Sequence, residues 1–532
     1  MGVIAKQSIR GTIVTYLGVA VGFLTTFFVI TRFLSAEDIG LARVLIDAAT
    51  LFIGLAQLGT SASILRFYPY FVSFSPKDGL SAQRSFSDSG LLAQRSNNEH
   101  GFFFWTMIVP MVGFMLVAAL FLACYTPLSQ WFGEKSPLFV NYYYLVLPLA
   151  FFMLYQAVFE TNANVRMHIV VPRAVRELLT RIGLLIVYLL YAFGILSMDG
   201  FVWSLVGVYA LAALCNAAYL FSLGDICLKP DFAYLRQNKQ LVKKYLYYTA
   251  FLVLSAVVSV LAPTLSSFFI TAQMGLSYTG IFAIATYMAV MVSIPYRSLT
   301  AIASPQLSMA IKNNDREEAG HLLAQVTGNL LLVGGLILAA IWVNIDLIFA
   351  ILPNGETYAI ARRTVLLLGI GQLFVAAFQF ELTALSYSRY YPFSLLLSFV
   401  LTALSLLLNN LLIPRWGMDG AAAATLISQV SYYVLALLTV RFALGSRLLT
   451  RQHLLIIVLL TGLFVANGLC LHFMPTMNIW LSSLLRSLLI VIVAWLAYRW
   501  QLSPELNQFI HQHIVPNTHG SADRKKSLTR SH

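Results

Sequence analysis

The sequence predicts an all-α polytopic membrane protein with about 14 transmembrane helices. Of its 532 residues, 59% are hydrophobic and 10% are charged, and the mean hydropathy is +0.79. Soluble domains carry about 25% charged residues. Apolar runs close to the roughly 20 residues that a helix needs to cross a bilayer recur along the whole chain. They are longer than the about 9–11-residue alternating strands of a membrane β-barrel, which excludes that class.

We place the transmembrane helices on these apolar runs. The first run follows a short basic segment without a small-residue cleavage site, so we interpret it as an uncleaved helix. The predicted spans are residues 11–34, 39–66, 101–125, 138–162, 174–196, 200–222, 245–271, 277–301, 321–343, 360–386, 391–413, 418–442, 453–474 and 478–500.

The distribution of basic residues predicts the orientation of these spans. Of the 34 Lys and Arg residues, 27 lie on the side of the N-terminus, six lie on the opposite side, and Arg486 lies inside the last span. Basic residues favour the cytoplasmic side, so both termini are predicted to be cytoplasmic. The net charge of +13 therefore marks membrane orientation and does not indicate a nucleic-acid partner.

No motif in the chain indicates an enzyme. The predicted outward loops are short and leave no room for an extracytoplasmic catalytic domain. The sequence contains no P-loop, no HExxH or other metal-binding spacing among its nine His, and no CxxC spacing among its four Cys. We expect no cofactor.

Two pairs of similar segments predict an internal repeat. "MDG" occurs at 198–200 and 418–420, an offset of 220 residues, and "FVITRFLSAEDIG" at 28–40 aligns with "FFITAQMGLSYTG" at 268–280, an offset of 240. The polar insert 72–99 lies between the two pairs in the first half and accounts for the difference. Spans 1–6 and 7–12 then form two six-helix bundles, related by a pseudo-two-fold axis along the membrane normal.

This repeat gives the predicted domain organisation, with two extra C-terminal helices. The domains are an N-terminal bundle (1–222, with the flexible cytoplasmic insert 72–99), a cytoplasmic linker (223–244), a C-terminal bundle (245–442), helices 13 and 14 (443–502) and a cytoplasmic tail (503–532).

Several segments resemble the polysaccharide-biosynthesis (O-antigen or oligosaccharide-lipid) flippases of the multidrug/oligosaccharidyl-lipid/polysaccharide exporter superfamily. They are "FLSAEDIGLARVL" after span 1, the two short glycine-containing outward loops, and "GMDGAAAATLIS" at the start of span 12. The resemblance implies a V-shaped pair of bundles in the bacterial inner membrane. These would flip an undecaprenyl-pyrophosphate-linked oligosaccharide by alternating access for surface polysaccharide biosynthesis.

Two other functions remain open. One is a cation-coupled multidrug exporter of the same superfamily. The other, less favoured because a large outward loop is absent, is a membrane glycosyltransferase or polymerase. We expect a lipid-linked oligosaccharide substrate and membrane lipids as partners, with polysaccharide polymerase or assembly proteins as candidate protein partners. The expected drive is a H⁺ or Na⁺ gradient.

Charges inside the spans are the candidate site residues, because a charge in hydrocarbon is costly and usually faces a cavity or a partner. Arg gives bidentate contacts to phosphate oxygens, as a pyrophosphate substrate would need. Arg43 and Asp47 are four residues apart on one helix face of span 2. They form either a mutually neutralising pair or a cavity-lining Arg held by Asp47.

The first half holds further candidates, each with an alternative interpretation. Arg32 ends span 1 and either snorkels to the interface or joins the site. Gln156 and Glu160 belong to a polar stripe that faces either a cavity or the cytoplasm. Arg176 and Arg297 stand at inner helix ends, where each could meet the pyrophosphate.

Three remaining features complete the expectations. Glu381 in span 10 is the deepest acid of the second half, and it serves either ion coupling or a structural hydrogen bond. Arg173, Glu177 and Arg181 repeat at four-residue spacing and predict a solvated ion-pair ladder. Gly18 and Gly22 form a GxxxG pattern, which we interpret as a helix-packing face.

Overall fold

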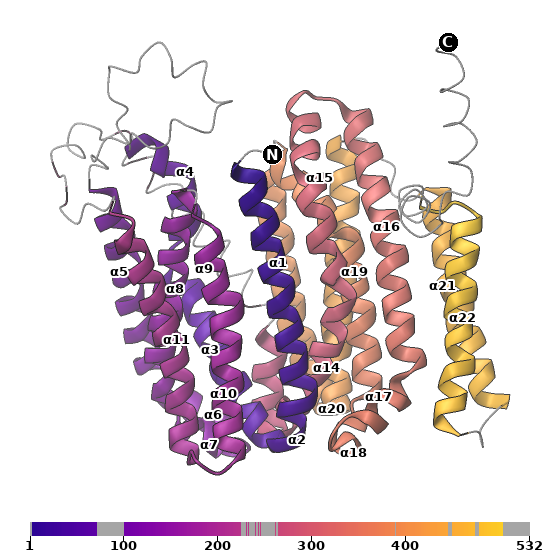
Figure 1. Cartoon of the computed structure of the whole chain (residues 1–532), viewed down its shortest axis with the longest axis horizontal. Coiled ribbons are helices and arrows are strands. Elements are labelled where there is room, and N and C mark those ends of the chain that lie inside the picture. Colours follow the sequence, from indigo (N-terminus) through magenta and orange to yellow (C-terminus); the bar gives the residue numbers. More distant parts are fainter. Residues whose placement is uncertain are drawn as a thin grey trace, which may run out of the picture. The chain divides into compact units, whose positions relative to one another are not determined.

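The computed structural model is almost entirely helical, with no strand among the residues that it describes (Figure 1). The described residues are 3–71, 101–166, 168–224, 264–388, 390–444, 450–473 and 478–503, with single positions between 230 and 261. The predicted insert and tail, most of the predicted linker and most of span 7 lie outside them.

Long helices alternate with short connecting helices in the first 222 residues. The elements are α1 (Val3–Leu24), the π-helical η1 (Thr25–Ile30), α2 (Thr31–Phe33), α3 (Ala36–Ala56), α4 (Thr60–Phe71), α5 (Phe102–Ala123), α6 (Tyr125–Gly133), α7 (Pro137–Asn141), η4 (Tyr143–Leu145), α8 (Val146–Val165), α9 (Val170–Ala174), the π-helical η5 (Val175–Leu179), α10 (Thr180–Ala192) and α11 (Met198–Ser222).

The same alternation continues in the later part of the chain. Its elements are α14 (Leu276–Val290), η6 (Met291–Ser293), α15 (Ile294–Lys312), α16 (Arg316–Val343), α17 (Ile345–Ile351), α18 (Gly355–Ala359), α19 (Arg362–Tyr387), α20 (Tyr391–Leu444), α21 (Arg451–Phe473) and α22 (Ile479–Arg499).

The described helices agree with the predicted polytopic membrane fold. Eleven of them are long and apolar enough to cross a membrane, within the described part of the chain. One of these, 392–443, is 52 residues long, about 78 Å at 1.5 Å per residue and more than twice a bilayer core. It is broken at Gly417, which has a φ of +57°, and so accounts for predicted spans 11 and 12. Predicted span 5 is helical as well, but its three charges, Arg176, Glu177 and Arg181, keep it out of the eleven.

One predicted span is not continuous. The sequence predicts a single helix over 39–66, whereas the structure ends α3 at Ala56 and starts α4 at Thr60. Leu58 and Gly59 between them have positive φ angles of 46° and 66°. The left-handed conformation cannot continue an α-helix, so the chain turns there.

Polar side chains cap the helix starts, which explains two of the charges near Arg43. The Ser35 hydroxyl accepts a hydrogen bond from the Asp38 backbone N–H at 3.1 Å, and the Ser35 N–H donates to the Asp38 carboxylate at 3.2 Å. This reciprocal arrangement is a capping box. Glu37 and Asp38 also lie in the first turn of α3, where acids suit the helix dipole.

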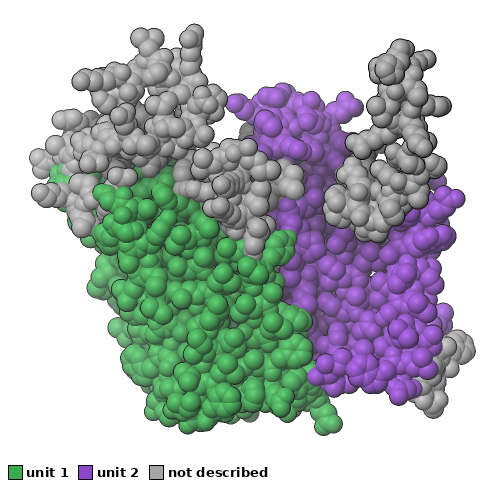
Figure 2. All heavy atoms as spheres, viewed as in Figure 1, with its two compact units in different colours: residues 1–285, 352–361, 398–424 green, residues 286–351, 362–397, 425–532 purple. Residues whose placement is uncertain are grey.

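The contacts divide the chain into two compact units (Figure 2). Unit 1 comprises residues 1–285, 352–361 and 398–424, and unit 2 comprises 286–351, 362–397 and 425–532. Unit 1 therefore includes α18 and the middle of α20, which lie far along the chain. The predicted division into two six-helix domains stays a prediction.

Candidate functional site

The polar interior of unit 1 begins with a salt bridge on α3. Arg43 Nε donates to Asp47 Oδ2 at 2.8 Å, as their four-residue spacing predicts. The Arg43 side chain is 23% exposed and that of Asp47 is 8% exposed. Asp47 thus orients a guanidinium group that keeps part of its surface accessible.

A second ion pair joins two helices of the same unit. Glu160 on α8 is buried, and its Oε1 lies 2.8 Å from Nη1 of Arg176 on η5. One turn away, Gln156 is also buried, and its amide donates to the Thr180 hydroxyl at 3.4 Å. The predicted polar stripe therefore faces another helix at both positions, and Arg176, with a side chain 49% exposed, belongs to the same group.

The predicted solvated ion-pair ladder is half buried instead. Glu177 is 9% exposed and pairs with Arg181 at 3.0 Å and with Arg176 at 3.4 Å. Arg181 also donates to the backbone oxygen of Gly18 at 2.8 Å. Because η5 packs directly on α1, the ladder cannot remain in water.

The GxxxG pattern explains how these charged side chains fit. A Cβ on Gly18 would collide with the Glu177 backbone oxygen, and a Cβ on Gly22 would collide with the Arg181 guanidinium. The predicted packing role is confirmed, although the surface that the glycines pack against is charged. The polar groups inside unit 1 therefore include Glu177 and Arg181, and also Thr180 through its bond to Gln156. The four-residue spacing of Glu177 and Arg181 did not by itself indicate that they pack against another helix.

Helix geometry places these groups at successive depths. Arg43 lies seven residues into α3 and Asp47 eleven, so they are about 10 and 16 Å from its start. Gln156 lies ten residues into α8, about 15 Å from its start, and Glu160 is one turn further. By the predicted topology both helices start at the extracytoplasmic side. The polar groups therefore span much of the depth of unit 1. We call them the unit 1 polar band, and its members are Arg43, Asp47, Gln156, Glu160, Arg176, Glu177, Thr180 and Arg181.

Two predicted site arginines lie apart from this polar band. Arg32 is exposed, and its guanidinium lies 5.6 Å from the ring centroid of its neighbour Phe33. This placement agrees with interfacial snorkelling. Arg297 is exposed on α15 and belongs to unit 2.

Unit 2 contains the predicted ion-coupling residue. Glu381 on α19 is 6% exposed, and its Oε1 accepts a weak hydrogen bond from Thr327 on α16 at 3.5 Å. Its Oε2 has no hydrogen-bond partner among the described residues. Its neighbours Phe380 and Leu382, and Val326 beside Thr327, belong to one buried apolar cluster. A carboxyl group in such surroundings avoids an unpaired buried charge by carrying a proton or by meeting a cation.

Two neutral amides of α19 bond to other helices. Tyr433 donates to Gln379 Oε1 at 2.6 Å, and Ser293 donates to Gln372 Oε1 at 2.9 Å. These bonds join α19 to α20 and to η6. They agree with the common use of amides to hold membrane helices together.

The two aligned segments of the predicted repeat meet inside unit 1. A Cβ on Gly40 would collide with the backbone oxygen of Leu276, and a Cβ on Gly280 would collide with that of Ala36. Residues 40 and 280, and residues 36 and 276, are counterparts at the predicted offset of 240. The contact is therefore reciprocal, as a local two-fold relation requires.

A second reciprocal pair of contacts lies nearby. Ser136 Oγ donates to the backbone oxygen of Thr271 at 2.6 Å, and Asn354 Nδ2 donates to that of Thr31 at 2.9 Å. Thr31 and Thr271 are counterparts at the same offset of 240, and Ser136 and Asn354 directly precede the equivalent short helices α7 and α18. By the predicted topology all four residues lie at the extracytoplasmic side. Sequence reasoning missed Ser136 and Asn354 because single polar loop residues carry no spacing signal.

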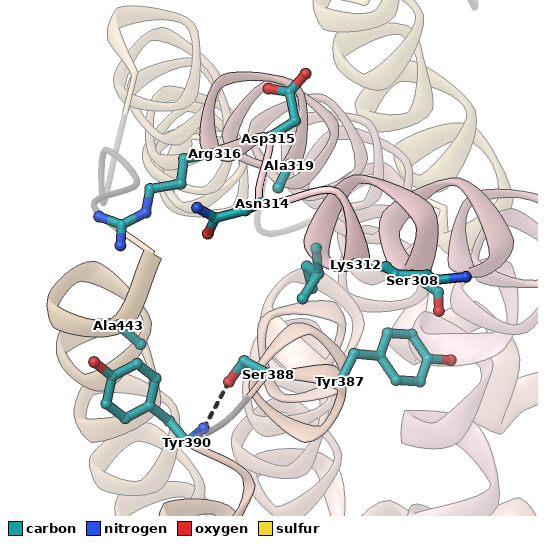
Figure 3. Close-up of a pocket in the computed structure, with 11 residues that line it drawn as sticks. Ser308, Lys312, Asn314, Asp315, Arg316, Ala319, Tyr387, Ser388, Tyr390 and Ala443 are labelled. Carbon is teal, nitrogen blue, oxygen red and sulfur yellow. Dashed lines mark hydrogen bonds between the residues drawn. The ribbon is translucent and has the colours of Figure 1, made fainter.

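Unit 2 also has an open pocket of about 570 Å³, and its lining includes none of the predicted site residues (Figure 3). The ends of α15, α16, α19 and α20 line it. Figure 3 shows the Arg316 and Lys312 side chains extending in opposite directions, and Asp315 stands beside them. The cations do not converge, so this pocket lacks the arrangement that a pyrophosphate group would need.

Comparison with known proteins gives fold relatives only. No protein-family model and no curated protein sequence matches the chain. A structure of the lipid II flippase MurJ in an inward closed conformation is similar, with a TM-score of 0.60 and 14% identity, over 92% of this chain and 99% of that one.

Two MOP superfamily transporters, the first of them a multidrug resistance protein, are similar over less of the chain. An inward-facing MATE family transporter of the MOP superfamily has a TM-score of 0.55 and 14% identity, over 84% of this chain and 98% of that one. A MOP superfamily transporter from Pyrococcus furiosus has a TM-score of 0.53 and 11% identity, over 84% and 97%. The chain is thus a multi-pass membrane protein with the transporter fold that MurJ and the MATE transporters share.

Proposed function

We propose that the protein is a flippase that moves an undecaprenyl-pyrophosphate-linked oligosaccharide across the bacterial inner membrane by alternating access, for surface polysaccharide biosynthesis. The observation that carries this proposal is the unit 1 polar band. It contains guanidinium groups that are held by carboxylates and remain partly exposed, namely those of Arg43 and Arg176.

The physical argument starts from the cost of these charges. An exposed guanidinium group facing lipid tails costs at least about 2.5–3.5 kcal/mol, so it is expected to face a water-filled space. Asp47 and Glu160 fix the orientation of their arginines, and both guanidinium groups stay partly exposed, as contact with phosphate oxygens requires. A substrate with a diphosphate headgroup suits such a series of cations at successive depths.

The reciprocal contacts support alternating access. Gly40 with Leu276 and Gly280 with Ala36 bring two helix ends together without side chains between them. By the predicted topology this contact closes the extracytoplasmic side. Opening that side would separate the two backbone surfaces and break the bonds from Ser136 and Asn354. These contacts would therefore form or break together when the extracytoplasmic side closes or opens.

The extent of the fold similarity favours a flippase over a drug exporter. The similarity to the lipid II flippase covers 92% of this chain, against 84% for the MATE transporter. A cation-coupled multidrug exporter remains the second candidate, and the lone carboxyl group of Glu381 is the observation that favours it. In the flippase proposal, the same Glu381 couples transport to a H⁺ or Na⁺ gradient.

The decisive experiment measures lipid transport directly. The full-length protein is reconstituted into vesicles with the lipid-linked oligosaccharide that accumulates in cells depleted of the protein, and movement of the glycan to the opposite leaflet is followed with an impermeant glycan-modifying reagent. We expect protein-dependent movement that falls about tenfold or more in Arg43→Ala and partly recovers in Arg43→Lys.

A matched control makes the result specific. Arg32→Ala removes an exposed arginine outside the unit 1 polar band and should leave the rate unchanged. Movement at the same rate in protein-free vesicles would refute the flippase proposal. Extrusion of a cationic drug, in place of lipid movement, would favour the exporter.

A further inference from the structure

One arginine of the chain takes no part in the proposed transport site and is more deeply buried than any of the site arginines. Arg486 lies on α22 in unit 2 and is 3% exposed. Its Nε donates to the backbone oxygen of Ser482 at 3.2 Å, and its Nη1 has no hydrogen-bond partner among the described residues. A buried guanidinium group with an unused donor needs an explanation, because the unmet bond alone costs about 1–3 kcal/mol.

The acid that interacts electrostatically with Arg486 is already paired with another arginine. Asp346, at the start of α17, lies within electrostatic range, but so does Arg362 at the start of α19. Arg362 occupies both oxygens of the Asp346 carboxylate, with Nη1 2.9 Å from Oδ1 and Nη2 3.1 Å from Oδ2. Two guanidinium groups therefore share one carboxylate, and the group of three carries one uncompensated positive charge.

Two more polar atoms of α21 and α22 have no hydrogen-bond partner among the described residues. They are Ser483 Oγ, one turn before Arg486 on α22, and Asn467 Oδ1 on α21, and both residues are buried. The two helices contact each other, and only five residues separate the end of α21 from the start of α22, so they run antiparallel. Leu463 of α21 and Val493 of α22 share one apolar cluster, which puts residues 467 and 486 within about one turn of the same level. Three polar groups of these two helices thus lack partners among the described residues, where a native interior satisfies nearly all such groups.

The position of Arg486 in the helix suits a lipid headgroup. It lies seven residues after Ile479, about 10 Å from the start of a helix that is about 31 Å long. A long guanidinium side chain can reach from that depth toward the headgroup region. Beside it, the flank of α22 presents Leu485 and Ile492, which are 38% and 51% exposed and could contact a hydrocarbon chain.

We propose that Arg486, Ser483 and Asn467 form a subsite that binds the phosphate group of a membrane lipid, whose hydrocarbon chain lies along the flank of α22. The phosphate supplies the negative charge that Asp346 cannot, and its oxygens accept from the free guanidinium N–H and from the serine hydroxyl. The subsite belongs to unit 2, and it does not depend on the proposed transport activity.

The test measures lipid binding to the purified full-length protein after exchange into lipid-free detergent. The probes are undecaprenyl monophosphate, phosphatidylglycerol, undecaprenol and inorganic phosphate, and the readout is the unfolding temperature as a function of probe concentration. We expect stabilisation by at least one of the two phosphate-bearing lipids and none by undecaprenol. Which of the two binds more tightly identifies the source of the phosphate.

Variants then assign the binding to this subsite. Arg486→Gln should weaken the apparent affinity about tenfold or more, while Arg499→Gln, an exposed arginine in the last turn of the same helix, should bind as wild type does. Ser483→Ala keeps the charge and should weaken binding by a smaller factor, which gives a readout if Arg486→Gln does not fold.

Three outcomes would overturn the proposal. The first is wild-type affinity in both Arg486→Gln and Ser483→Ala. The second is equal stabilisation by undecaprenol and undecaprenyl monophosphate, which would show that only the chain binds. The third is full competition by millimolar inorganic phosphate together with no lipid preference, which would indicate a site for free phosphate.

Discussion

The two units hold their buried charges in opposite ways. In unit 1 the acids of the polar band are paired, Asp47 with Arg43 and Glu160 with Arg176, and those arginines stay partly exposed. In unit 2 Glu381 has a single weak hydrogen bond, to a hydroxyl group, among the described residues, and its neighbours Phe380 and Leu382 belong to an apolar cluster. Unit 1 is thus suited to hold cations for an anionic substrate, and unit 2 is suited to hold an acid whose charge can change.

This difference has a thermodynamic consequence. Removing one partner of a buried ion pair leaves the other charge uncompensated, which is strongly destabilising. Removing a lone buried carboxyl group leaves no such charge and can even stabilise the fold. The same type of substitution should therefore have opposite effects on stability in the two units.

The largest stability effect is expected for Asp47→Ala. It leaves the Arg43 guanidinium without its carboxylate, and because Arg43 is 23% exposed the loss should be about 2 kcal/mol, below the ~3–5 kcal/mol of a fully buried pair. Thermal unfolding in detergent measures it. Glu37→Ala, an exposed acid of the same helix, is the control, and an equal loss in both variants would contradict the paired role of Asp47.

Glu381→Gln should abolish the coupling of transport to an ion gradient without lowering the stability of the fold. We expect an unfolding temperature equal to or above that of the wild type, while the acceleration of transport by an imposed H⁺ or Na⁺ gradient, about 5- to 150-fold for a typical coupling energy, disappears. Glu317→Gln alters an exposed acid at the start of α16 and serves as the control. A gradient response that survives in Glu381→Gln would remove Glu381 from the coupling mechanism.

Tyr433→Phe tests a neutral hydrogen bond of unit 2. It removes the 2.6 Å bond to Gln379 and should cost about 1 kcal/mol of stability, less than Asp47→Ala, without altering the gradient response. Equilibrium unfolding gives the cost, with Tyr387→Phe on an exposed tyrosine as the reference. If Tyr433→Phe destabilised the protein as much as Asp47→Ala does, the contrast between paired charges and neutral bonds would fail.

The smallest effect is expected for Arg32→Gln. The side chain is exposed and lies outside both interiors, so the stability should change by less than about 0.5 kcal/mol. The transport rate should also stay within the error of the vesicle assay. A loss of transport rate as large as that of Arg43→Ala would show that Arg32, at the end of α2, acts together with the unit 1 polar band.

The sequence predicted those features that depend on composition or on short spacing. Hydropathy predicted the membrane-spanning helices, and the four-residue spacing predicted the bridge between Arg43 and Asp47. The pair of Glu160 and Arg176 could not be found in this way, because it joins two helices across a turn and depends on how they pack.

The differences from prediction have local causes. Gly59 within an apolar run could equally belong to a continuous helix, and only the left-handed conformation of Leu58 and Gly59 shows the break. The alignment of segments 28–40 and 268–280 identified Gly40 and Gly280 as equivalent positions. Equivalent positions need not be in contact, so the sequence did not predict that these two segments pack against each other.

The reciprocal contacts of unit 1 also constrain how the chain can be assembled during synthesis. Thr31 accepts its bond from Asn354, 323 residues later, and Gly40 packs on Leu276. The first helices must therefore wait in the membrane, with these surfaces uncovered, until much of the second half has been translated. A fragment that ends before residue 276 therefore lacks the backbone that Gly40 packs on.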